Sequence, residues 1–262
     1  MVNGARPDPG LVAMKKRLRA LYLLLSSFAI GILHVPIALA KSASGHKLTH
    51  TRSSGIRNSG PADSLDLLPL APSVYDSLEL DIRGLSREAF TYAKKGFDRL
   101  VEEGRLTNDS IISIIDFSKP STEKRLFILD MRNYKVLFQT LVSHGRNSGQ
   151  RFATRFSNQH SSYMSSPGFY ITRETYQGRN GYSLKLEGIE PGINDNAYER
   201  GIVVHGAAYV NESIGQAQGY IGRSQGCPAV PSGMAAPVIN QIRNGSLMFI
   251  YHPAYTSRIV RS

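Results

Sequence analysis

The stretch VVHGAAYVNESIGQAQGYIGRSQGCPAVP, residues 203–231, contains the two side chains from which the chemistry of this chain can be argued. It opens with a β-branched run that ends in His205-Gly206. It closes with a glycine-rich loop that holds Cys227, the only cysteine in 262 residues. A single cysteine cannot form a disulfide within the chain. Most lone cysteines are small buried apolar residues, but a polar glycine-rich loop is a poor place for one, so a reactive thiol is the stronger hypothesis.

A thiol becomes a strong nucleophile as thiolate, and a neighbouring imidazole is a common means of producing it. His205 follows four residues of strand character, and Cys227 lies on a loop that can fold back across that strand end. Gly226 allows close backbone approach, and we expect its N–H and that of Cys227 to form an oxyanion hole. The pair His205 and Cys227 is therefore the predicted base and nucleophile.

The N-terminus predicts export. An apolar run over residues 20–40 follows a basic cluster at residues 15–19 and ends in Ala38-Leu39-Ala40, a small-x-small cleavage pattern. Residues 1–40 are thus a predicted signal peptide, with Met14 a more ordinary start for it. An uncleaved anchor is the alternative, because the run approaches the length of a membrane span. Either way we expect the protein in the periplasm or cell envelope.

Three further segments follow. Residues 41–64 are rich in Ser, Gly and Arg and are interpreted as a disordered basic tether. Residues 65–108 form a helical arm, in which a helix begins near Ser86 and ends near Gly104. Residues 109–262 form a mainly β domain. The net charge of +11 favours anionic partners such as envelope polymers, and the absence of Trp and of a groove-reading helix argues against nucleic acid.

The β assignment rests on alternating and β-branched runs. KRLFILDM and KVLFQTLVS flank RNY and predict a hairpin. Residues 109–118 form an apolar run that fits either a short helix or a strand. Further strands are predicted at residues 168–172, 182–188, 200–205 and 246–252. The fold class is therefore mainly β (α+β), with a helical arm at the N-terminus.

With these segments in place, the chain resembles the murein L,D-transpeptidase catalytic-domain family, YkuD-like and in a divergent branch. The family pattern is a His-Gly near a strand end followed, after a spacer, by Ser/Thr-His-Gly-Cys. His205-Gly206 and Ser224-Gln225-Gly226-Cys227 match it, and SSPGFYITRETYQG and GINDNAYERGIVVHGA also resemble the divergent branch. The resemblance runs from about Ser110 to His252 and makes residues 109–262 the catalytic domain, with a β-sandwich or mixed sheet.

The resemblance implies a cysteine acyltransferase. Cys227 attacks an L,D-peptide carbonyl of a peptidoglycan stem peptide, His205 acts as base, and the acyl-enzyme passes to an amine. Two alternatives stay open: a murein L,D-peptide hydrolase with the same pair, and a non-catalytic murein-binding module. No cofactor is implied, and a monomer is expected. The seven histidines and one cysteine show no metal-ligand spacing, so no metal is expected either.

The sequence departs from the family pattern in two places. Gln225 occupies the position of the motif histidine, and Pro228-Ala229-Val230 follows Cys227 where the family usually has an arginine that holds a substrate carboxylate. Arg223 is either a replacement for that arginine or a solvated loop charge. The residues placed around the substrate are Ser224, Arg223, Gln225, Gly206 and His144. His144 also ends an apolar run in His-Gly, although a structural histidine bonded to loop backbone is the alternative.

Overall fold

A computed structural model describes residues 73–255. The predicted signal peptide, the predicted tether and the first residues of the predicted arm lie outside the described residues. Among residues 73–255, no helix has the length and apolar content needed to cross a membrane.

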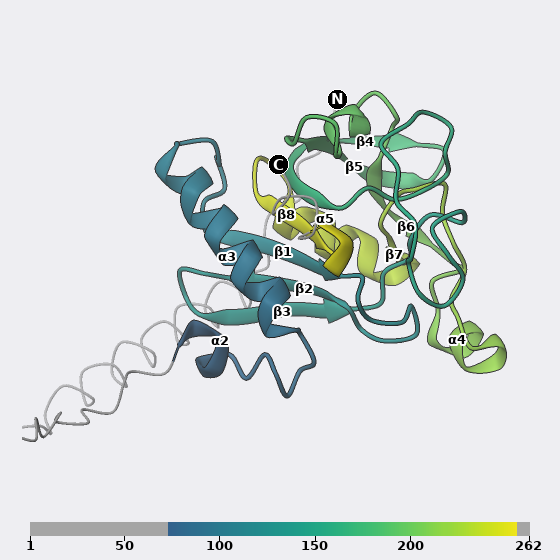
Figure 1. The fold of residues 1–262 in the computed structure, drawn as a ribbon, viewed down its shortest axis with the longest axis horizontal. Helices are drawn as coiled ribbons and strands as arrows, with labels where there is room; N and C mark the ends of the chain where they lie inside the picture. Colours follow the sequence, from purple (N-terminus) through teal and green to yellow (C-terminus); the bar gives the residue numbers. More distant parts are fainter. Residues whose placement is uncertain (1–72, 256–262) are drawn as a thin grey trace, which may run out of the picture. The chain divides into compact units, whose positions relative to one another are not determined.

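One mixed sheet of eight strands forms the framework, in the order β3-β2-β1-β8-β4-β5-β6-β7 (Figure 1). The strands are β1 (Ile111–Asp116), β2 (Leu126–Asp130), β3 (Lys135–Thr140), β4 (Gly168–Gly178), β5 (Gly181–Gly188), β6 (Val203–Ala207), β7 (Ala229–Pro231) and β8 (Leu247–Tyr251). Strand β8 pairs parallel to β1, and β7 pairs parallel to β6, while the other pairs are antiparallel. The mainly β fold and the β2–β3 hairpin are confirmed, and the ambiguous run at 109–118 is strand β1.

Helix α3 (Arg87–Glu102) is the predicted helix of the arm. The Ser86 hydroxyl accepts the N–H of Ala89 at 3.2 Å, which caps the first turn. Gly104 follows the helix with φ +64°, the left-handed conformation that ends many helices. The preceding short helix α2 (Val74–Ser77) is capped by Ser73. Buried side chains of α3 join those of the sheet in one core, so the helix is an integral part of the domain.

Alternation along the central strands produces two cores, one on each face of the sheet. Ile112 and Ile114 of β1 pack with α3, whereas Ile111 and Ile115 pack with helix α5 (Ala235–Ile242). Because successive strand residues point to opposite faces, an uninterrupted apolar strand indicates that both faces are covered. The remaining helical segments are α4 (Glu212–Gln218), η1 (Asp195–Ala197) and η2 (Ser232–Met234).

The segment after β3 connects the two ends of the sheet. Strand β3 is the first strand in the sheet order, yet the residues that follow it lie beside β7 at the other end. The Ser143 N–H donates to Ala229 O at 2.8 Å, and Gly145 forms a parallel bridge with Ser224. This segment therefore covers the free edge of β7, and it holds the loop that carries Cys227 at two points, Ser224 and Ala229.

Candidate active site

His205 lies in the middle of β6, where the backbone is fixed by pairing on both sides. Its register partners are Ser183 on β5 and Ala229 on β7. The ring Nδ1 lies 3.0 Å from the carbonyl oxygen of Gly206. Since a carbonyl oxygen only accepts, Nδ1 carries the proton and Nε2 is the basic nitrogen. Burial lowers the pKa of His205, and the hydrogen bond to Gly206 opposes this change, so the imidazole is a neutral base at neutral pH.

Cys227 lies two residues before Ala229, the residue that pairs with His205. Its side chain is partly buried, and its Sγ lies 3.7 Å from Gly201 O, toward which the thiol donates. Burial raises the pKa of the Cys227 thiol, while the Val203 backbone and the Arg200 guanidinium act in the opposite direction. The resting site therefore contains a neutral thiol and a neutral imidazole.

The nucleophile loop, residues 222–228, is shaped by Ser224. Its hydroxyl donates to Cys227 O at 2.6 Å and accepts the N–H of Gly226 at 3.0 Å. The Gly226 N–H, expected as an oxyanion donor, is already engaged by this hydrogen bond. Gly226 is needed for its conformation instead: its φ is +124°, and a Cβ there would lie 2.8 Å from Met164 O. Ser224 also acts on the loop itself, because its hydroxyl bonds the backbone of Gly226 and Cys227.

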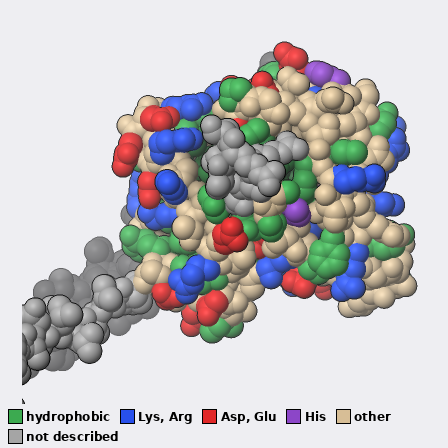
Figure 2. Space-filling model, viewed as in Figure 1, with side chains coloured by type: hydrophobic (Ala, Val, Ile, Leu, Met, Phe, Trp, Pro, Cys, Tyr) green, Lys and Arg blue, Asp and Glu red, His purple; other side chains and the backbone are tan. Residues whose placement is uncertain are grey.

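His205 and Cys227 line one cleft of about 710 Å³. Gly206, Ser224, Gln225 and Arg223, all placed around the substrate by the sequence, line it too. Gln225 is exposed there. The cleft has four arginines, Arg146, Arg179, Arg200 and Arg223, and no Asp or Glu. Basic and acidic side chains are interspersed on the face shown in Figure 2, so this one-sided lining is a local feature that favours an anionic ligand.

Arg223 is tied to the neighbouring loop rather than free in solvent. Its Nη1 donates to Gly149 O at 3.1 Å and to Arg146 O at 3.4 Å, and its guanidinium lies over the Tyr220 ring. Arg146 is exposed and stacks on Tyr163, 4.1 Å from the ring centroid. Both guanidinium groups are therefore oriented at the cleft before any ligand arrives.

His144 does not face the cleft. It is fully buried, its Nδ1 lies 2.9 Å from Nη2 of Arg125, and its Nε2 lies 3.3 Å from Gly149 O. Burial and the Arg125 charge lower the pKa of His144 to about 3. The structure does not place His144, expected near the substrate, at the cleft; it fits the alternative of a neutral structural histidine, which accepts from a buried arginine, itself bonded to Val142 O and Lys119 O.

The sequence matches the L,D-transpeptidase catalytic domain over residues 81–251. The chain belongs to this family. A search of curated proteins found no match.

Solved L,D-transpeptidases are similar to the chain at low identity. L,D-transpeptidase 3 from Mycobacterium tuberculosis, with a faropenem-derived adduct, is 12% identical with a TM-score of 0.36, and the match covers 55% of this chain and 60% of that one. An L,D-transpeptidase from Mycobacterium smegmatis is 13% identical with a TM-score of 0.35, covering 55% and 59%. One from Xylanimonas cellulosilytica is 14% identical with a TM-score of 0.33, covering 59% and 68%. The chain spans about three fifths of the two mycobacterial proteins.

Two cleft residues of this L,D-transpeptidase-family domain escaped the sequence prediction. Tyr209 lines the cleft, its hydroxyl interacts with the Ser143 side chain, and burial raises its pKa, as does the nearby Cys227. Arg200 precedes Gly201, the residue whose carbonyl accepts from the thiol. Both lie in stretches that resemble the family, Arg200 in GINDNAYERGIVVHGA and Tyr209 four residues past His205. Neither is part of the His-Gly or Ser-x-Gly-Cys pattern, and Arg200 looks like an ordinary loop charge in the sequence.

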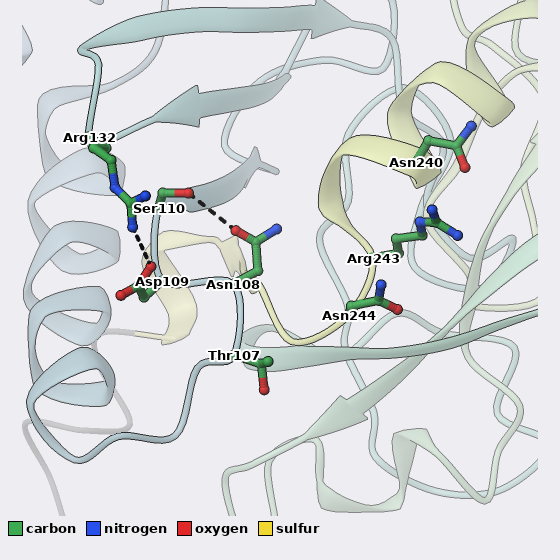
Figure 3. A pocket seen from close by; sticks show the side chains of 8 residues that line it. All are labelled: Thr107, Asn108, Asp109, Ser110, Arg132, Asn240, Arg243 and Asn244. Carbon is green, nitrogen blue, oxygen red and sulfur yellow. Dashed lines mark hydrogen bonds and ion pairs between the residues drawn. The ribbon is translucent and has the colours of Figure 1, made fainter.

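A second pocket, of about 510 Å³, is distinct from the cleft (Figure 3). Its lining is polar: Thr107, Asn108, Asp109, Ser110, Arg132, Asn240, Arg243 and Asn244. Arg132 and Asp109 form an ion pair at 2.9 Å, and Ser110 bonds Asn108 at 3.3 Å. It contains none of the predicted site residues. Within residues 73–255, no group of three or more His, Cys, Asp or Glu is arranged to hold a metal ion.

Proposed function

We propose that the protein is a cysteine-dependent L,D-transpeptidase that acts on peptidoglycan stem peptides through a thioester acyl-enzyme. The observation that carries this proposal is the shared cleft of His205 and Cys227, with Nδ1 of the imidazole fixed on Gly206 O. A partly buried thiol that shares a cleft with an oriented, neutral imidazole supports nucleophilic acyl transfer.

In the first half-reaction, His205 Nε2 takes the thiol proton and the sulfur attacks the stem-peptide carbonyl. The Cys227 N–H donates to the developing oxyanion, since the Gly226 N–H is occupied by Ser224. The C–N bond then breaks, and the leaving amine takes the proton from His205. In the second half-reaction an acceptor amine attacks the thioester, and its proton returns through His205 to the sulfur.

The arginines suit a substrate that carries carboxylates. Guanidinium groups bind carboxylates in a fixed, often bidentate geometry. Arg223 and Arg146 are held in place by backbone and aromatic contacts, and Arg179 lines the same cleft from the β4–β5 turn. We assign to Arg223 the carboxylate contact that the missing arginine after Cys227 would otherwise make.

This substrate sets where the enzyme works. Peptidoglycan lies outside the cytoplasmic membrane, so the proposal includes export through the segment 1–40 and action in the periplasm or cell envelope. Anionic envelope polymers are additional partners that the excess of basic over acidic residues would attract.

The test uses the full chain and its Cys227→Ala variant. Each is incubated with a carbapenem and, separately, with purified peptidoglycan. We expect a covalent adduct on Cys227 by intact mass, and new crosslinks among the muropeptides, with the wild type alone. Identical muropeptide profiles for the two proteins would refute the enzyme and leave the non-catalytic binding module.

A further assay separates transfer from hydrolysis. Stem peptides are supplied with and without a soluble amine acceptor, and products are separated by mass. A crosslinked product that increases with acceptor supports the transpeptidase, whereas trimmed stems at a rate independent of acceptor would replace it with the hydrolase.

A further inference from the structure

We propose that Arg200 is a positioning residue for the Cys227 nucleophile: its guanidinium holds the 157–166 segment against Gly226 and keeps a positive charge on the thiolate side of the cleft. The inference rests on Cys227 being the nucleophile, as proposed above. It assigns a role to an arginine that lies outside the His205-Gly206 and Ser224–Cys227 motifs.

The first step is the hydrogen bonding of Arg200. Its Nη1 donates to Ser157 O at 2.9 Å and to Ser166 Oγ at 2.7 Å. Its Nη2 donates to Met164 O at 2.7 Å and to Ser162 Oγ at 3.2 Å. All four acceptors lie in one irregular segment, which has no strand or helix of its own. The guanidinium therefore fixes the shape of this wall of the cleft.

The second step is the contact between this wall and the nucleophile loop. A Cβ at Gly226 would lie 2.8 Å from Met164 O and 3.4 Å from Nη2 of Arg200. The residue after Arg200, Gly201, accepts from the Cys227 thiol through its carbonyl. Residues 200 and 201, which lie between η1 and β6, therefore both contact the nucleophile region. The Arg200 guanidinium lies near Gly226, and the Gly201 carbonyl accepts from the Cys227 thiol.

The third step is charge. All four acceptors of Arg200 are neutral, and within residues 73–255 it forms no ion pair with a carboxylate. The lining of the cleft adds no acidic group. Its positive charge is therefore not compensated by an anion at rest, and the Cys227 thiolate is an anion that it can stabilise. Burial lowers the pKa of Arg200, whereas Tyr170 and Cys227 raise it. In return, the positive charge of Arg200 lowers the pKa of the Cys227 thiol.

Arg125 shows how a purely structural arginine differs in this fold. It is fully buried, it bonds backbone carbonyls and His144, and it does not line the cleft. Arg200 keeps the same kind of neutral hydrogen bonding but faces the cleft that contains the thiol. Arg125 therefore stabilises loops away from the site, whereas Arg200 stabilises a loop next to the nucleophile.

The experiment measures the pH dependence of Cys227 alkylation by iodoacetamide, by intact mass, in the full chain. The variants are Arg200→Gln, Arg200→Lys and a control, Arg132→Gln, which removes an exposed ion-paired arginine outside the cleft. We expect Arg200→Gln to raise the thiol pKa by about one pH unit, hence about tenfold slower alkylation at a fixed pH below the pKa. The control keeps the wild-type profile. An unchanged profile in a folded Arg200→Gln variant would overturn the proposal.

Arg200→Lys gives a second reading if the glutamine variant does not fold. Lysine keeps the charge but cannot supply the planar fork, so we expect near wild-type alkylation with carbapenem acylation slowed severalfold. Wild-type acylation in Arg200→Lys would refute the positioning role. If the wild type itself is never acylated, the proposed function fails, whereas the alkylation profile still tests Arg200 independently.

Discussion

The Ser165 hydroxyl donates a 3.0 Å hydrogen bond to the carbonyl oxygen of Gly226, 61 residues away in the sequence. The same hydroxyl accepts the N–H of Gly145 at 3.0 Å. Three loops, around residues 145, 165 and 226, therefore meet on one buried oxygen. The backbone of the nucleophile loop is held in place from outside as well as by its own Ser224.

Replacing Ser165 with alanine tests this arrangement. The change leaves a buried donor and a buried acceptor without a partner, so we expect the free energy of unfolding to fall by about 1–3 kcal/mol. Acylation of Cys227 should slow as well, because the loop loses an anchor. Urea unfolding and carbapenem acylation measure the two effects. Ser213→Ala, at an exposed site on α4, should change stability by less than about 0.5 kcal/mol; equal effects in both variants would contradict the expectation.

Gly226→Ala should damage the site by conformation alone. A φ of +124° is costly for any residue with a side chain, and the added Cβ would approach Met164 O to 2.8 Å. We expect a loss of about 1–3 kcal/mol in the free energy of unfolding, together with slower acylation, measured by urea unfolding and intact mass. Gly233→Ala is the matched control, since a Cβ there would meet nothing within 4 Å. A Gly226→Ala protein as stable and as reactive as this control would refute the argument.

The pH dependence of acylation should report His205. Burial lowers its pKa below the ordinary 6.5, so the neutral base persists to mildly acidic pH, and the rate should fall on acidification with a midpoint below 6.5. His205→Gln should lose this acid limb and depend on the thiol alone, whose pKa is raised above its ordinary value by burial. Single-turnover acylation from pH 4 to 9 shows whether each protein has the acid limb. The exposed His160→Gln variant serves as control, and an acid limb that survives in His205→Gln would exclude His205 as the base.

Stability at low pH should report His144. The unfolded chain takes up a proton at this residue near pH 6.5, while the folded imidazole stays neutral down to about 3. Acidification through this window therefore favours the unfolded state, and stability falls as pH drops from about 6.5 toward 3. His144→Asn removes the titrating group, so its stability should depend less on pH there than that of the wild type. Parallel urea-unfolding curves across the window would contradict this.

Much of the framework could be predicted from local patterns. The apolar spacing and Ser86 cap of α3, and the hairpin β2–β3, follow from periodicities that tertiary contacts only reinforce. Helices α4 and α5 and the three-residue β7 were not predicted, because short elements owe their stability to packing rather than to their own pattern. Strand β4 extends to Gly178 although its second half is largely exposed, since pairing with β5 continues beyond the apolar residues.

The site residues, too, could be predicted only in part. His205 and Cys227 could be predicted because thiol–imidazole chemistry and the family's sequence pattern point to the same two residues. Arg200 and Tyr209 could not, because their role depends on which loops the fold brings beside the thiol. For His144 the sequence leaves two interpretations open, because its His-Gly resembles that of His205. The fold favours the structural one by burying the ring against Arg125, a neighbour 19 residues away that no local pattern reveals.

The bridge between Gly145 and Ser224 has a consequence for how the protein matures. The nucleophile loop reaches its final shape only when the first hairpin, through the segment that follows it, lies against the last strand of the sheet. Contacts between such distant parts of a chain require closure of a long loop, which slows folding. In a newly made or partly unfolded molecule, the Cys227 thiol therefore lacks the loop contacts that shape the site. Acylation of Cys227 should then report that the whole domain has folded.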